Sequence, residues 1–117
     1  MIKIAIVDDN TFLQKTIQDK LSFFSDIEIR MKAIHGDDII EKLEKNHNID
    51  LILMDIEMPK RNGIDATEII KNKFPQIKII MLTVFDNDEN IFKAIKADAD
   101  GYFLKKVLPP DLVYSLL

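Results

Sequence analysis

Residues 49–59 read IDLILMDIEMP, and the other expected elements are arranged around this stretch. A run of Leu, Ile and Met this short, bounded by polar residues and a proline, favours a parallel strand buried on both faces. The run ends on the carboxylate of Asp55. Because ligands of open parallel sheets bind beyond the carboxyl ends of the strands, Asp55 is a candidate site residue from its position alone.

Four further strands are expected around this central one. They are rich in apolar and β-branched residues and end at polar or breaker residues, which is typical of strands. They span residues 2–7, 27–33, 77–82 and 101–104. The strand at 27–33 alternates apolar and charged residues, so one of its faces meets water and it should lie at a sheet edge.

The segments between these strands have the periodicity of helices. Apolar residues recur at steps of three and four, which predicts amphipathic helices. These helices lie at 12–24, after 36, after 63 and at 88–97. Five strand-helix alternations predict an α/β fold, namely a doubly wound parallel sheet with helices on both faces and right-handed crossovers.

Two details of the helices can be tested against a structure. In the helix at 88–97, Ile91, Ala94 and Ile95 are expected to face inward. The last helix, after Pro109 and Pro110, has barely two turns before the chain ends, so it is expected to be truncated.

Length and composition restrict the class of protein. The chain has 117 residues, of which 47% are hydrophobic, and no linker or repeat divides it, so we expect one domain with one core. The absence of Cys excludes disulfides, thiolate metal sites and a cysteine nucleophile, which fits a reducing, cytoplasmic setting. We expect neither a signal peptide nor a membrane span. A net charge of -4 argues against direct binding to nucleic acid.

Polar side chains follow the strands at the edge where their carboxyl ends meet. Asp8 and Asp9 come after the first strand, and Asp55 ends the central one. Thr83 and Lys105 follow the last two strands. Crowded carboxylates repel one another unless positive charge lies among them. Lys105 supplies one charge, and oxygen ligands without Cys or clustered His favour Mg²⁺, or Mn²⁺, over zinc.

This arrangement predicts a particular chemistry, although each residue also has a structural interpretation. An aspartate beside such a metal can attack phosphorus and become an aspartyl phosphate. Taken singly, Asp8 and Asp9 are typical of helix caps, Thr83 of strands and Lys105 of a solvated edge. Their joint placement at the ends of four strands favours a functional site. Five other aspartates are expected to be caps, turns or solvated charges: Asp26, Asp37, Asp38, Asp98 and Asp100. His35 and His47 are expected at the surface without partners.

The pattern resembles the receiver domain of two-component response regulators over residues 1–117. The matching motifs stand in family order: Asp8-Asp9, residues 53–59 (LMDIEMP), Asn62-Gly63, Leu82-Thr83 and residues 101–105 (GYFLK). The resemblance implies a flavodoxin-like five-stranded sheet in the order 2-1-3-4-5. One departure is Asp98, which stands at a helix end where the family often has Gly, so a local backbone adjustment is expected there.

The resemblance also implies roles for individual residues. Asp55 would be the phosphoacceptor, and Asp9 and Asp55 would bind Mg²⁺ directly. Asp8 would hold a metal-bound water. The other implied roles are a metal contact from the backbone carbonyl of Glu57, phosphoryl binding by Thr83 and Lys105, and an aromatic switch at Tyr102.

A phosphorylation-controlled signalling switch is the function that the resemblance implies. Its partners would be a sensor histidine kinase or phosphotransfer protein and, on phosphorylation, a second copy of the chain. Residues 83–86 and 101–102 look most like receivers that carry a C-terminal helix-turn-helix, so contact with DNA would come only through an effector domain outside this chain. The domain would be no enzyme beyond its own phosphorylation and dephosphorylation.

Three other functions can be weighed against this one. An interaction module that no longer accepts phosphate is disfavoured by the intact set of site residues. A Mg²⁺-dependent phosphatase of the haloacid dehalogenase type needs its nucleophile after the first strand with a second Asp two residues on, whereas Asn10 and Thr11 follow the pair here. A flavin binder needs a phosphate loop where Asp8 and Asp9 would repel the phosphate.

Overall fold

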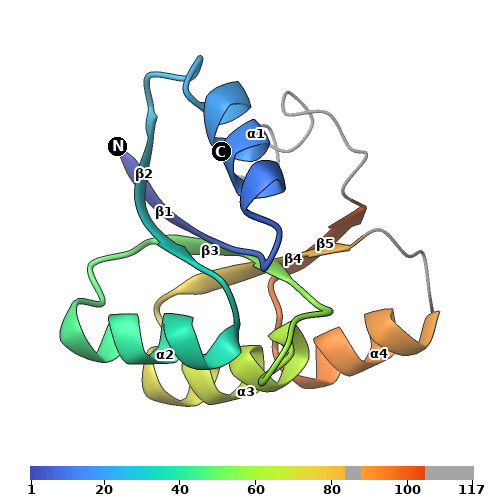
Figure 1. Cartoon of the computed structure of the whole chain (residues 1–117). Helices are drawn as coiled ribbons and strands as arrows, with labels where there is room; N and C mark the ends of the chain where they lie inside the picture. Colours follow the sequence, from blue (N-terminus) through green and yellow to red (C-terminus); the bar gives the residue numbers. More distant parts are fainter. Residues whose placement is uncertain (84–87, 105–117) are drawn as a thin grey trace.

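The computed structural model describes residues 1–83 and 88–104, which form one parallel sheet and its covering helices (Figure 1). The strand order is β2-β1-β3-β4-β5, which confirms the predicted fold class. The strands are β1 (Ile2–Val7), β2 (Ile27–Ala33), β3 (Leu51–Asp55), β4 (Lys78–Thr83) and β5 (Gly101–Leu104). As predicted from its alternating pattern, β2 lies at an edge, and all the pairings are parallel.

The helices lie on both faces of this sheet. They are α1 (Thr11–Leu21), α2 (Gly36–Lys45), α3 (Gly63–Lys73) and α4 (Asp88–Lys96). Figure 1 shows α1 on one face and α2, α3 and α4 on the other. In the described part of the chain, no helix has the length and apolar character that crossing a membrane requires.

Alternate residues of each strand supply two separate apolar layers. Strands β1, β3 and β4 are buried on both faces, which is why their sequences are almost continuously apolar. Beneath α2, α3 and α4 the strand residues are Ala5, Val7, Ile52, Met54, Ile79 and Met81. Beneath α1 they are Ile4, Ile6, Leu51, Leu53, Ile80 and Leu82.

The inward face of α4 differs from the prediction. Ala94 and Ala97 are buried, and Ile91 is half-buried, but Ile95 is 67% exposed. The prediction for Ile95 was therefore wrong. Ala94 and Ala97, the residue after the helix, lie on its buried side, and Ile95 is turned about 100° away from Ala94 toward solvent.

Three residues expected to be caps or surface residues without partners have defined contacts. His35 caps α2, because its Nδ1 accepts a hydrogen bond from the Asp38 amide at 3.0 Å. His47 is exposed, as expected, but its ring stacks on Phe74 at a centroid distance of 5.1 Å. Asp100 accepts from the Ile79 amide at 2.8 Å and does not point freely into water. The prediction that the histidines lack partners was wrong.

Asp98 has the backbone conformation that its position after α4 suggested. Its φ is 69°, in the left-handed region that favours Gly. The amides of Ala97 and Asp98 still donate to carbonyls of the last helical turn, at 3.0 Å each. Asp98 therefore keeps the conformation that Gly would adopt, without the backbone adjustment that was expected, and this turn leads the chain from α4 to β5.

Candidate functional site

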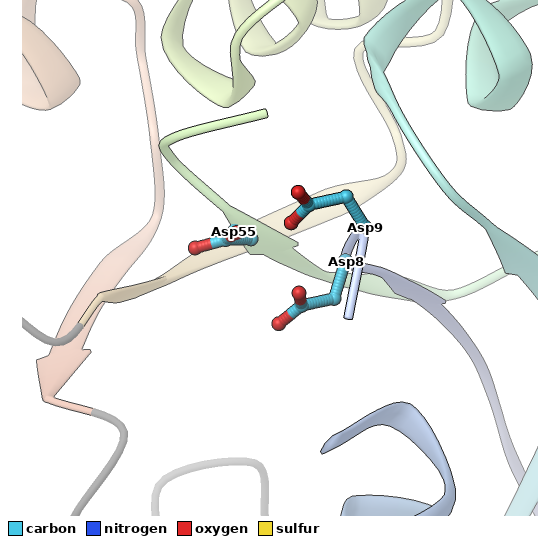
Figure 2. Close-up of side chains that lie close together, drawn as sticks. All are labelled: Asp8, Asp9 and Asp55. Carbon is cyan, nitrogen blue, oxygen red and sulfur yellow. The ribbon is translucent and has the colours of Figure 1, made fainter. Parts of the chain in front are cut away.

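The carboxyl ends of β1 and β3 bring three aspartates together. Val7 of β1 pairs with Met54 of β3, so Asp8 and Asp55 follow neighbouring positions on adjacent strands. Asp8 is 2% exposed and Asp55 is 7% exposed, whereas Asp9 is exposed. Ligand oxygens of the three side chains lie within 4.8 Å of one another. Figure 2 shows the carboxyl groups directed to the same side of the strand ends.

The turn from β1 into α1 fixes the acidic pair. The Asp8 amide donates to the carbonyl of Ala33, the last residue of β2, at 3.0 Å. The Asp8 side chain accepts from the Asn10 amide at 2.9 Å. The Asn10 side chain in turn caps α1 by accepting from the Leu13 amide at 3.1 Å. The pair therefore lies in a short segment held between a strand and a capped helix.

Asp55 is held by its own loop and by the start of α3. One of its carboxylate oxygens accepts from the Ile56 amide at 2.9 Å. The Gly63 amide donates to the Ile56 carbonyl at 2.8 Å, which folds the loop back over the strand end. A Cβ atom at Gly63 would lie 1.9 Å from the Asp55 carbonyl oxygen, so only glycine fits at this close approach.

The loop between β3 and α3 is also tied to α2. The Gly36 amide donates to the Arg61 carbonyl at 3.0 Å, and the Arg61 Nε lies 2.5 Å from an Asp37 oxygen. The hydrogen bond to Asp37 and its charge raise the pKa of Arg61 above the usual value. The preceding residue, Lys60, has a φ of 65°, which turns the loop toward α2. The segment after Asp55 is therefore anchored at two points.

Of the predicted site residues on β4 and β5, Thr83 lies on the adjacent part of the same edge, whereas Tyr102 lies within β5 and pairs with Met81. Thr83 is 2% exposed and follows Leu82, the residue that pairs with Asp55. Tyr102 of β5 is half-buried and packs against the apolar layer beneath α2, α3 and α4. Lys105 and the expected last helix lie outside the described residues.

The donor set can be compared with what a metal ion needs. The grouped ligand atoms are all carboxylate oxygens, and their mutual distances allow one ion to contact more than one of them. Oxygen ligands alone favour a hard divalent cation such as Mg²⁺. The cluster therefore fits a magnesium site.

Sequence reasoning overlooked one residue of this region, Gln14. It is 4% exposed, and its amide donates to the carbonyl of Asp8, which follows β1, and to the carbonyl of Ala33, which ends β2. Its spacing offered a signal. Gln14 precedes Ile17 by three positions and Leu21 by seven, so it belongs to the inward stripe of α1. A polar residue in that stripe needs a buried partner.

Comparison with known families shows to which family the chain belongs. The family model described as "Response regulator receiver domain" matches residues 4–116. The chain belongs to the response regulator receiver family. The family assignment agrees with the resemblance found in the sequence and with the grouped acidic residues.

Curated relatives of this receiver domain include regulators of transcription. The chain is 38% identical over 115 residues to the uncharacterized transcriptional regulatory protein YxjL of Bacillus subtilis, covering 98% of the chain and 52% of that protein. It is 39% identical over 113 residues to the response regulator protein VraR of Staphylococcus aureus, covering 95% of the chain and 53% of that protein. The chain thus spans about half the length of these relatives.

Solved structures show the same fold. A CheY-like receiver domain protein from Methanospirillum hungatei has a TM-score of 0.89 and 31% identity, with 99% of this chain and 90% of that chain covered. A DNA-binding response regulator of the LuxR family from Staphylococcus aureus has a TM-score of 0.91 and 28% identity, with 99% and 96% covered. Receiver domains are signalling proteins, so this family membership favours regulation over metabolic catalysis.

Proposed function

We propose that this receiver domain is switched by phosphorylation of Asp55 in the presence of Mg²⁺. The observation that carries the proposal is the grouping of Asp8, Asp9 and Asp55, whose ligand oxygens lie within 4.8 Å of one another. Such a grouping of negative charge is unfavourable without a cation, which supports metal binding. Asp55 is the member of the group at the end of a fully buried strand, which supports its role as the acceptor.

The proposed reaction is a phosphoryl transfer to the protein itself. One carboxylate oxygen of Asp55 forms a bond to phosphorus as the bond between phosphorus and the donor breaks, and the donor keeps the bonding electrons. The donor would be a phosphohistidine of a sensor kinase or of a phosphotransfer protein. Mg²⁺ bound at the site would offset the negative charge of the carboxylates and of the phosphoryl oxygens.

Each residue of the acidic group has a proposed part in holding the ion. Asp9 and Asp55 would bind it directly, and Asp8 would hold a water bound to it. The backbone carbonyl of Glu57, two positions after the acceptor, would complete the protein's contacts. The hydrogen bond from Asn10 to Asp8 and the one from Ile56 to Asp55 support this division, because each fixes a carboxylate while leaving it oxygen atoms for further contacts.

Thr83, Lys105 and Tyr102 are proposed to respond to the phosphoryl group. The hydroxyl of Thr83 and the ammonium of Lys105 would bind its peripheral oxygens. Phosphorylation adds charge and acceptor oxygens, so it would draw Thr83 toward Asp55 and let Tyr102 turn inward. The surface of α4 and β5 would then change, which is the signal that a partner detects.

The output of the whole protein is proposed from its relatives. YxjL is named as a transcriptional regulatory protein, and this chain covers about half of it. We therefore infer a DNA-binding effector domain beyond this chain, with dimerisation on phosphorylation and with action in the cytoplasm beside the kinase.

Incubation with acetyl phosphate and Mg²⁺ tests the acceptor directly. Intact-mass spectrometry is expected to show one added phosphoryl group on the native chain and none on Asp55→Asn, because the amide is not a nucleophile. Asp50→Asn is the matched control, since Asp50 immediately precedes β3 and Asp55 ends it. This control should be phosphorylated like the native chain. An unchanged mass for the native chain, or an added group on Asp55→Asn, would overturn the proposal.

A further inference from the structure

Gln14 of α1 is buried, and its side chain contacts the main chain of the acidic pair. Its Nε2 donates to the carbonyl oxygen of Asp8 at 2.6 Å and to the carbonyl oxygen of Ala33 at 2.6 Å. The side chain is nearly inaccessible to solvent, with 4% of the residue exposed. Both amide hydrogens are therefore used to join the ends of two neighbouring strands.

These bonds hold the main chain of Asp8 from both sides. Its amide donates to Ala33, and its carbonyl accepts from Gln14. The Asp8 carbonyl belongs to the planar peptide group that joins Asp8 to Asp9, so fixing this carbonyl restricts the backbone from which both side chains extend. The Ala33 carbonyl accepts hydrogen bonds from the Asp8 amide and from the Gln14 side chain. We call this set of bonds among Asp8, Gln14 and Ala33 the clamp.

We infer that Gln14 is a positioning residue that sets the geometry, and hence the Mg²⁺ affinity, of Asp8 and Asp9. This inference rests on the proposed magnesium site. Gln14 itself contacts no carboxylate in the bonds described, so it acts through the backbone. Residues that orient the ligands of a metal typically change its affinity by about 10- to 100-fold when they are removed.

The test is a Mg²⁺ titration of the native chain and of Gln14→Met by isothermal titration calorimetry. Met has a similar length and volume but no donor, so the clamp is lost while the packing of α1 is nearly kept. Gln18→Met is the matched control, because it makes the same change one turn later on the same helix. We expect the dissociation constant to rise about tenfold in Gln14→Met and to stay at the native value in Gln18→Met.

A second variant and a second measurement separate positioning from stability. Gln14→Asn keeps the amide but is one methylene shorter, so it cannot reach both carbonyls, and its Mg²⁺ affinity should also fall. Phosphoryl uptake from acetyl phosphate should be slow in both Gln14 variants at low Mg²⁺ and should recover at saturating Mg²⁺. A general folding defect, which thermal unfolding without metal would detect, would not recover in this way.

The outcomes distinguish this inference from the proposed function. Native affinity in every folded Gln14 variant would overturn the positioning role and leave the magnesium site intact. A native chain that binds no Mg²⁺ would overturn both.

Discussion

The two edges of the sheet use the same residue type in different ways. At the amino edge, aspartates are dispersed and accept hydrogen bonds from strands. Asp50 accepts from the Lys3 amide at 2.9 Å, and Asp100 accepts from the Ile79 amide at 2.8 Å and from Lys71 Nζ at 3.0 Å. At the carboxyl edge the aspartates are grouped, with ligand oxygens within 4.8 Å of one another.

Structural and functional aspartates can be told apart by what their carboxylates contact. At the amino edge each carboxylate satisfies an amide at the start of a strand, so it replaces an acceptor that the sheet does not supply there. At the carboxyl edge, grouping like charges costs free energy that folding alone does not require. Acids that repel one another at a strand end therefore indicate a site, whereas acids that complete a sheet's hydrogen bonds indicate stability.

The largest effect is expected where a helix closes over the carboxyl edge. Gly63→Ala should lower the free energy of unfolding by about 3 kcal/mol or more, because the new Cβ would overlap the Asp55 carbonyl and the backbone would have to shift. Gly101→Ala, at the amino edge, is the matched control. Its Cβ would meet side chains and no backbone, namely Ile80 at 3.3 Å and Phe103 at 3.6 Å, so the loss should be about 1 kcal/mol or less. Equal losses in urea unfolding would contradict the close approach.

A smaller loss of stability is expected when an aspartate at the amino edge is removed, and it tests the difference between the two edges. Asp100→Ala should lower the free energy of unfolding by about 1–2 kcal/mol, because the amide of buried Ile79 loses its acceptor and Lys71 loses its ion pair. Its phosphoryl uptake should remain native.

Asp9→Ala should show the opposite pattern. It should lose phosphoryl uptake and keep its free energy of unfolding, because the substitution removes one of three crowded charges from an exposed position. Unfolding curves and intact masses of the two variants check this, and a matching pattern in both would refute the distinction.

The smallest effect concerns another acid near the amino edge. Asp98→Gly should raise the free energy of unfolding by about 0.5 kcal/mol, since Gly relieves the left-handed backbone at φ 69° but adds freedom to the unfolded chain. The urea midpoint measures this gain, and phosphoryl uptake should not change. A lower midpoint would mean that contacts of the Asp98 side chain outweigh its backbone strain.

Much of the fold was predictable because strand and helix periods are local properties of the sequence. The apolar run ending at Asp55 predicted a buried central strand, and the alternating residues 27–33 predicted an edge strand; both predictions are confirmed. The prediction that Ile95 faces inward was wrong because the buried side of α4 is narrower than the periodicity suggested. In the structure Ala94 and Ala97 occupy the buried side, and Ile95 faces solvent.

Some features of the candidate site were also predictable from local sequence, and others were not. The local pattern was enough to place Asp8, Asp9, Asp55 and Thr83 at the carboxyl ends of strands, and parallel strands bring such residues to one edge. The bridge from Gln14 to Asp8 and Ala33, and the close approach of Gly63 to Asp55, became visible only in the folded chain. These contacts join segments distant in the chain. Their distances depend on how helices pack on the sheet, which no local pattern encodes.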